Sequence, residues 1–218
     1  MKTLCFYLAF IFITSGCTST NYIKLEEWEV FGPLSVVEHG PPEELIKDVE
    51  EVLANNQGNL LYPEDVGNID FSSFKKGMTY KYASLDFRMD YTFEHYSDGY
   101  FYFVMTRSDY DGPISARTDG VNWEWKGNKV GDRYYVMAGQ ECKFKLGACR
   151  YKIVGDRYHS SELYFRDGVW VRKFDVSKVL SSTYEVSVYD KFGMILYTGT
   201  YNSRSGGNVS YLKLVSTE

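Results

Sequence analysis

Residues 85–94, LDFRMDYTFE, alternate without exception: every odd position is apolar and every even position is polar. A period of two places the apolar side chains on one face of an extended strand and the polar ones on the other. A strand that buries one face and wets the other is typical of antiparallel sheets. This stretch therefore predicts a half-buried antiparallel strand and, with it, a β-rich domain.

Turn signals downstream extend this strand into a series of hairpins. Ser97-Asp98-Gly99 predicts a tight turn, and residues 100–105 then return with apolar side chains on both faces, as expected inside a sheet. We expect roughly ten antiparallel strands in an all-β or β-rich α+β fold, arranged as a barrel or a sandwich. Further hairpins are predicted at Gly127-Asn128, Leu146-Gly147, Asp167-Gly168 and Lys191-Phe192-Gly193.

One amphipathic helix is predicted near residues 42–55, ahead of the strands. Pro41-Pro42 stand at its start, where proline is tolerated, and Glu43 and Glu44 complement the positive end of the helix dipole. Residues 60–77 are predicted to be a loop with one short helical turn. The helix carries one apolar stripe at helical spacing, made of Leu45, Ile46, Val49, Val52 and Leu53.

The N-terminal residues are typical of a targeting segment. Lys2 supplies a positive charge, residues 4–13 form an uncharged apolar run, and small residues follow it up to Cys17. The run is too short to cross a bilayer as a stable helix, which needs about 20 apolar residues. The segment therefore predicts export from the cytoplasm.

Thr14-Ser15-Gly16-Cys17 resembles the lipobox of bacterial lipoproteins, in which the cysteine is acylated and becomes the mature N-terminus. The resemblance covers the leader only and implies a cell-envelope protein that is anchored in a membrane by acyl chains, palmitate among them, on Cys17. In Gram-negative families an Asp after the cysteine favours the inner membrane, so Thr18 implies the outer membrane, facing the periplasm. An ordinary cleaved signal with an incidental Cys17 is the alternative.

We expect residues 1–16 to be a signal peptide, residues 17–24 a lipidated cysteine with a short tether, and residues 25–218 a single β-rich domain. Without the leader, 23 of the 24 basic residues remain against 29 acidic ones, a net charge of −6. A domain of that sign has no general attraction to nucleic acid. No motif after Cys17 identifies a family.

Cys142 and Cys149 remain in the mature domain once the leader is removed. If Lys145-Leu146 form the turn of a hairpin, the two cysteines lie opposite each other across the strands, and an oxidising compartment favours a disulfide. A metal site would need more ligands, and no His lies nearby in the sequence. We therefore expect a structural disulfide, with no metal and no cofactor.

Two groups of residues are candidates for binding. Trp123 and Trp125 project to the same face of one predicted strand, which would be a platform for a sugar ring or another apolar partner if open, and core if closed. Lys143, Lys145 and Arg150 make the hairpin around them basic within an acidic chain. This hairpin either meets an anionic partner or is a solvated edge that lysines protect from pairing with other strands.

No catalytic motif is found, and the three histidines lie in separate segments. Glu94 and His95 are neighbours on a strand, so their side chains are predicted to point to opposite faces. Asp90 and Glu94 share the polar face of the same strand, where paired carboxylates could act in a hydrolase if suitably spaced.

The sequence therefore predicts a cell-envelope lipoprotein with a binding or structural role, which contacts the membrane through its lipid and an envelope protein or glycan through its domain. A carboxylate-dependent hydrolase of envelope polymers is one alternative. The other is an inhibitor or immunity-type lipoprotein that acts against a basic secreted enzyme, since the acidic chain suits a basic target.

Overall fold

A computed structural model describes residues 40–126, 133–153, 158–174, 183–203 and 210–218. Within them, the fold consists of one antiparallel sheet of twelve strands, one α-helix, α1 (Glu43–Asn55), and two short 3-10 helices, η2 (Pro63–Asp65) and η3 (Gln140–Cys142). The strands are β1 (Thr79–Ala83), β2 (Arg88–Ser97), β3 (Tyr100–Arg107), β4 (Ile114–Thr118), β5 (Trp123–Lys126), β6 (Tyr135–Val136), β7 (Gly147–Lys152), β8 (Tyr158–Arg166), β9 (Val169–Phe174), β10 (Thr183–Tyr189), β11 (Ile195–Asn202) and β12 (Ser210–Thr217). The signal peptide, Cys17 and the predicted tether lie outside the described residues.

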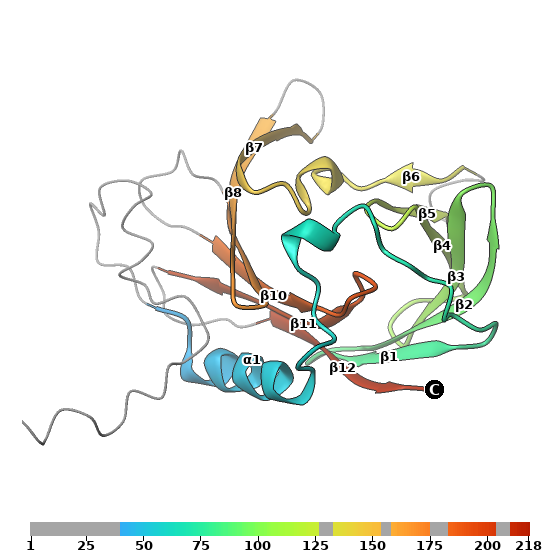
Figure 1. Cartoon of the computed structure of the whole chain (residues 1–218), viewed down its shortest axis with the longest axis horizontal. Coiled ribbons are helices and arrows are strands. Elements are labelled where there is room, and N and C mark those ends of the chain that lie inside the picture. The colour runs from blue at the N-terminus through green and yellow to red at the C-terminus, as the bar shows by residue number, and fades with distance from the viewer. Residues whose placement is uncertain (1–39, 127–132, 154–157, 175–182, 204–209) are drawn as a thin grey trace, which may run out of the picture.

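The strands follow one another as two meanders joined at β1 and β12. The sheet order is β6-β5-β4-β3-β2-β1-β12-β11-β10-β9-β8-β7, so β6 and β7 are its edges. In the described part of the chain these two edges are not paired with each other, and the sheet curves without closing into a barrel (Figure 1). The predicted antiparallel β fold with one helix is confirmed. In the described residues it is neither a closed barrel nor a sandwich of two sheets, but a single curved, open sheet.

Two of the predicted hairpins have the turn that their sequences favour. Asp98 and Gly99 join β2 to β3 with φ values of 52° and 81°, and Asp167 and Gly168 join β8 to β9 with 50° and 89°. Two consecutive positive φ values are typical of the two-residue turns whose twist matches that of the flanking strands. The predicted turn at Gly127-Asn128 lies outside the described residues.

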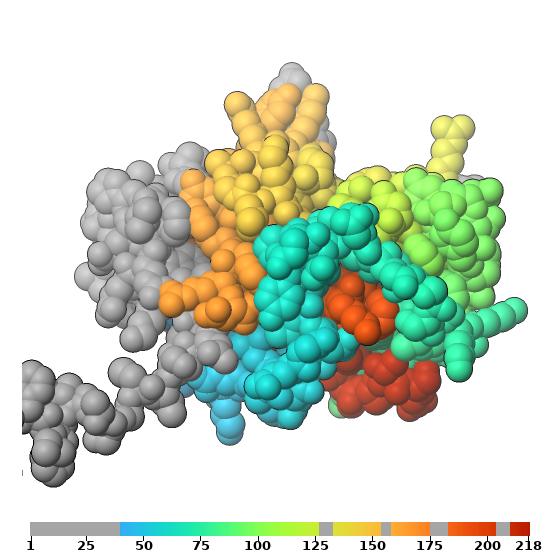
Figure 2. All heavy atoms as spheres, viewed as in Figure 1, coloured from blue at the N-terminus to red at the C-terminus, as the bar shows by residue number. Residues whose placement is uncertain are grey.

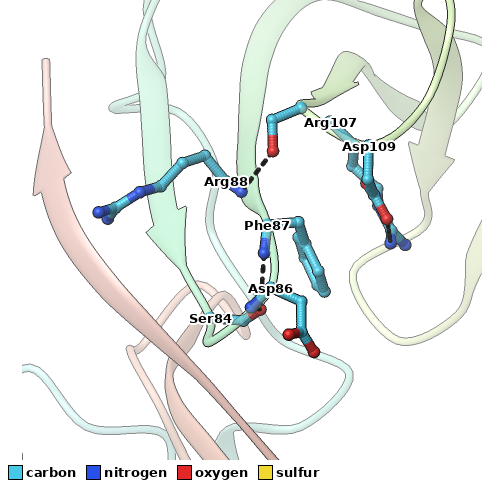
Figure 3. Close-up of polar contacts among 7 residues, drawn as sticks. Ser84, Asp86, Phe87, Arg88, Arg107 and Asp109 are labelled. Atoms are coloured by element: carbon cyan, nitrogen blue, oxygen red, sulfur yellow. Dashed lines mark hydrogen bonds and ion pairs between the residues drawn. The ribbon is translucent and has the colours of Figure 1, made fainter.

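Of the alternating stretch 85–94, residues 88–94 lie in β2, which begins at Arg88. Met89 and Phe93 are buried, whereas Leu85 is 67% exposed. The chain leaves the alternating pattern there because residues 84–87 form the turn between β1 and β2. The Ser84 hydroxyl accepts hydrogen bonds from the backbone N–H groups of Asp86 and Phe87 at 3.2 and 3.3 Å (Figure 3).

A β-bulge interrupts β2 at Glu94. The pairing with β3 passes from Phe93–Phe103 directly to His95–Tyr102, so Glu94 has no partner in the register. Glu94 and His95 are both exposed. The prediction that they point to opposite faces is wrong in this respect, because an extra residue in one strand breaks the strict alternation of side chains.

The helix α1 covers the convex face of the sheet over β9, β10 and β11. Its buried side chains, Leu45, Val49, Val52 and Leu53, pack against buried residues of those strands, among them Tyr184 and Tyr197. Burial of such aliphatic side chains contributes on the order of 2 kcal/mol each. The polar face of α1 is tied to the sheet by Lys213 of β12, whose ammonium lies 3.2 Å from both Asp48 and Glu51.

The segment between α1 and β1, residues 59–77, fills one end of the concave side and is called the plug here. Phe71 and Phe74 belong to the aromatic cluster of β1–β5, with the Phe71 ring 4.0 Å from that of Phe101. Leu61 is fully buried, and its N–H donates to the Tyr189 carbonyl at 3.0 Å. Figure 2 shows the plug as the teal surface in front of the orange-red atoms of the β10–β11 region. The interior of the curved sheet is therefore blocked at this end.

A buried carboxylate, Asp190, holds the turn between β10 and β11. Its Oδ1 accepts hydrogen bonds from the N–H groups of Phe192 and Met194, both at 2.9 Å, and its Oδ2 accepts one from the Tyr80 hydroxyl at 3.1 Å. Asp190 is 3% exposed, and this burial raises the pKa of the carboxyl to about 6. The carboxyl of Asp190 therefore binds its proton more tightly in the folded chain than in the unfolded chain.

Asp190→Asn tests this assignment, because the amide stays neutral while its oxygen can still accept from Phe192 and Met194. A folded pKa above the unfolded value means that the stabilisation by protonation is complete below about pH 4 and is lost as the pH rises through 6. A shift of about two units corresponds to about 3 kcal/mol. We expect the free energy of unfolding of the wild type to fall by about 2.5 kcal/mol, relative to Asp190→Asn, between pH 4 and pH 7.5, because a small part of the loss has already occurred at pH 4.

Urea unfolding monitored by circular dichroism measures the difference at the two pH values. Asp111→Asn, at an exposed loop position, is the matched control and should keep the pH profile of the wild type. Parallel profiles for wild type and Asp190→Asn would contradict the assignment.

Candidate functional site

Beyond the plug, the concave side of the sheet holds a partly open cavity of about 210 Å³, called the chamber here. Positions along β1 show where it lies: Tyr80 contacts Phe74 of the plug, and Tyr82, two residues on, lines the chamber. Its wall comes from both halves of the sheet. It is lined by Tyr82, Met89, Tyr91, Trp123, Trp125, Gln140, Lys143, Arg172, Glu185, Tyr189, Gly193, Met194, Ile195 and Thr198.

Aromatic rings from β2 and β5 form one wall of the chamber. The Trp123 ring lies 5.4 Å from Tyr91 and 6.2 Å from Trp125, and the Trp125 indole N–H donates to the Tyr91 hydroxyl at 3.5 Å. Burial raises the pKa of Tyr91, so its hydroxyl stays protonated near neutral pH. The two tryptophans named from the sequence thus share a face, as expected, and that face is the interior.

Three charged side chains form the opposite wall. Arg172 of β9 places one guanidinium nitrogen 3.8 Å from the Glu185 carboxylate of β10. Lys143 enters the chamber with its ammonium 4.7 Å above the Phe144 ring and 5.1 Å above the Tyr189 ring. Burial lowers the pKa of Lys143 to about 8, and the nearby positive charge of Arg172 adds to this effect. The chamber therefore combines a mainly aromatic wall with a net positive charge.

Residues 137–146 connect the two edges of the sheet, β6 and β7, and are called the bridging segment here. On one side, Gln140 Oε1 accepts a hydrogen bond from the backbone N–H of Trp123 at 3.5 Å. On the other, the Arg172 guanidinium donates to the carbonyls of Cys142 and Lys143 at 3.1 and 2.6 Å. The segment thus closes the chamber where the sheet itself is open.

A disulfide between Cys142 and Cys149 fastens the bridging segment to β7, with Cα atoms 5.8 Å apart. The predicted disulfide is confirmed, although its expected cross-strand setting is wrong. Cys142 lies in η3 and only Cys149 lies in a strand. The tight 3-10 turn brings the cysteines together because it folds the chain back before β7 begins.

A second cavity of about 250 Å³, the vestibule, adjoins the chamber. The two share Glu185 and Thr198 as lining residues, and the vestibule extends to the turn at residues 84–87. It lies at the far end of β1 from the plug. The interior therefore runs from the plug through the chamber to the 84–87 turn.

The rim of the vestibule is held by contacts between two loops. The Arg107 guanidinium lies 4.0 Å from the centre of the Phe87 ring and is paired with Asp109 at 2.7 Å. The Arg88 N–H donates to the Ser108 hydroxyl at 2.9 Å (Figure 3). These contacts hold the 84–87 turn against the loop that follows β3.

The remaining residues named from the sequence lie elsewhere. Lys145 and Arg150 are exposed, and Arg150 lies 4.4 Å above the Tyr158 ring, so the expected basic hairpin is divided between the interior and the surface. Asp90 and Glu94 do not line the chamber or the vestibule. The structure therefore brings together Trp123, Trp125 and Lys143 and separates them from the other candidates.

An aromatic group on the outer face of β3–β5 was not foreseen from the sequence. The Arg117 guanidinium lies between the rings of Tyr100 and Tyr134, at 4.1 and 4.2 Å, and pairs with Glu124 at 2.5 Å. Its charge is thus matched by a carboxylate within the fold. We interpret the group as a structural contact that connects these strands on their outer face.

Sequence reasoning missed Arg172 and Glu185. Arg172 is followed by Lys173, and Glu185 stands between Tyr184 and Val186. In both strands a period of two does not tell an interior from solvent. In the described residues, no group of three or more His, Cys, Asp or Glu side chains is placed to hold a metal ion. No helix in that part of the chain is long and apolar enough to cross a membrane.

Comparisons with protein-family models, with curated proteins and with solved structures found no match.

Replacing Cys142 and Cys149 together by Ala should lower the free energy of unfolding by about 2.5 kcal/mol, because the unfolded chain regains the freedom of a short loop. It should also speed amide hydrogen exchange at residues 140–143, since the bridging segment would lose its covalent tie to β7 and keep only noncovalent contacts, such as the Arg172 hydrogen bonds and the packing of Phe144 on Trp170. Denaturant unfolding and hydrogen exchange measure the two effects. Reduction of the wild type should reproduce both, and reductant should leave the variant unchanged; unchanged exchange at 140–143 in both would contradict this role.

Proposed function

We propose that this chain is a cell-envelope lipoprotein, anchored through Cys17, whose domain binds a small molecule in the chamber. The observation that carries the binding role is the chamber itself: an interior cavity with aromatic walls and a few convergent polar groups. Such a combination is typical of small-molecule sites, in which apolar walls supply affinity and polar groups fix orientation. The vestibule provides a path of approach from the 84–87 turn.

The site is suited to a ligand of about one ring. A purely apolar cavity of about 150 Å³ accommodates one benzene molecule, so a chamber of about 210 Å³ can hold a ring with a small substituent. A longer ligand could extend into the vestibule. The parallel arrangement of Trp123 and Trp125, whose ring planes meet at 26°, offers an extended aromatic surface to such a ring.

The geometry supports binding better than catalysis. The carboxylates expected for a hydrolase, Asp90 and Glu94, stand apart from both cavities, and only Glu185 is a carboxylate of the chamber. Glycoside hydrolysis by the common route needs two carboxyl groups facing one bond. An inhibitor of a basic secreted enzyme remains a prediction from charge alone.

Binding in the chamber can be tested with benzyl alcohol, a neutral one-ring probe. We expect it to shift the indole N–H resonances of Trp123 and Trp125 in nuclear magnetic resonance spectra of the full chain, because both rings line the chamber. Trp170 is the internal control, because it does not line the chamber and its indole donates to the Leu61 carbonyl at 3.2 Å. Shifts of similar size at all three indoles, or none at any, would contradict binding in the chamber.

The anchor can be tested by intact mass. The wild type should be recovered from the membrane fraction beginning at Cys17 and carrying the mass of acyl chains, whereas Cys17→Ala should lack that mass and leave the membrane. Two or more acyl chains are enough for stable anchoring, so the difference in partitioning should be nearly complete. A soluble, unacylated wild type would refute the lipoprotein and leave the binding role to be judged on its own experiment.

A further inference from the structure

We infer that the ligand of the chamber is a small organic anion, whose negative group pairs with Lys143 while its single apolar ring lies against Trp123 and Trp125. This inference rests on the proposed binding function and adds the charge of the ligand to it. It is carried by the geometry of the charged wall, in which one cation has a partner and the other does not.

The charges of the chamber do not balance. Arg172 has the Glu185 carboxylate 3.8 Å away, whereas Lys143 has no carboxylate within 4.0 Å among the residues that the structure describes. The ammonium of Lys143 instead lies over the rings of Phe144 and Tyr189. A cation over aromatic rings is favourable, but rings alone do not replace the water that the half-buried Lys143 gives up in the chamber. An anion in the chamber would supply the missing partner.

A second polar atom of the same wall also lacks a partner. The Nε–H group of Arg172 is buried and finds no hydrogen-bond acceptor in the described part of the chain, although the other guanidinium nitrogens bind the bridging segment and Glu185. Buried donors without acceptors are rare in folded proteins and call for an explanation. This atom is shielded from the chamber itself, so it adds an uncompensated donor beside Lys143 and is not a contact for the ligand.

The groups facing Lys143 favour an anion over a cation. They are Arg172 from β9 and Glu185 and Tyr189 from β10. Tyr189 is neutral near pH 7, since burial raises the pKa of its hydroxyl. Two positive charges and one negative charge therefore meet at this wall. The lowered pKa of Lys143, about 8, is consistent with an ammonium that lacks its counter-ion, and an anion bound beside it would raise that pKa again.

Benzoate, benzamide and benzamidine test the inference, because they share one ring and differ in charge. With the full chain at pH 7, we expect benzoate to bind at least tenfold more tightly than benzamide and benzamidine to bind most weakly, as measured by shifts of the Trp123 and Trp125 indole resonances. Lys143→Met, which keeps most of the length of the side chain and removes its charge, should bring benzoate and benzamide to within twofold of each other.

Lys145→Met is the matched control, since Lys145 lies two residues away and is exposed; it should keep the preference of the wild type. Equal affinities of the wild type for benzoate and benzamide would overturn the inference about charge and leave the proposed binding function standing. If none of the three probes binds, both fail. An unchanged benzoate preference in Lys143→Met would also overturn the role of Lys143.

The pH dependence of the wild type gives a test that needs no variant. Benzoate should bind roughly tenfold more weakly at pH 9.5 than at pH 7, because Lys143 loses its proton on the way, while benzamide should bind equally at both. A benzoate affinity that does not change with pH, together with equal affinities for benzoate and benzamide at pH 7, would overturn the inference even if Lys143→Met failed to fold.

Discussion

The closure of the molecule depends on how the bridging segment is held across the open side of the sheet. A twelve-stranded sheet with free edges at β6 and β7 would expose unpaired backbone groups, which is a hazard for association with other chains. The disulfide Cys142–Cys149 and the hydrogen bonds from Arg172 to the carbonyls of Cys142 and Lys143 fix the segment there. The same contacts orient Lys143. One set of interactions therefore both covers the open side of the sheet and places a positive charge in the chamber.

The two faces of the curved sheet are covered in different ways, and the site follows from this difference. On the convex side α1 packs closely over β9–β11; Gly199 permits this, since a Cβ there would meet Leu45 at 3.1 Å. On the concave side the plug fills one end with Leu61, Phe71 and Phe74, whose bulk stops short of Tyr82. The space left between the plug and the 84–87 turn is the chamber with its vestibule. A binding role therefore arises where the packing of the interior is incomplete.

Parts of the candidate site could be found from the sequence, though not the surface to which they belong. The alternation around Trp123 and Trp125 showed that they share a face, and local sequence does not reveal whether a face meets solvent or an interior. Lys143 and Lys145 looked equivalent within one basic stretch, but the 3-10 turn at 140–142 sends the first into the chamber and leaves the second exposed. Arg172 and Glu185 escaped notice because each is an ordinary strand residue until β9 and β10 curve around a lumen.

The sequence by itself determined the local structure: the half-buried alternation of β2, the Asp-Gly turns at 98–99 and 167–168, and the amphipathic helix at 43–55. These features depend on side-chain period and on φ preferences, which act over a few residues. Only the tertiary structure decided that one continuous sheet would curve without closing, that the bulge at Glu94 would expose two neighbours together, and that Lys143 would enter the interior. Those outcomes depend on contacts between residues distant in the chain, such as the bridge from Arg172 to Lys143, and no local pattern encodes which distant groups will meet.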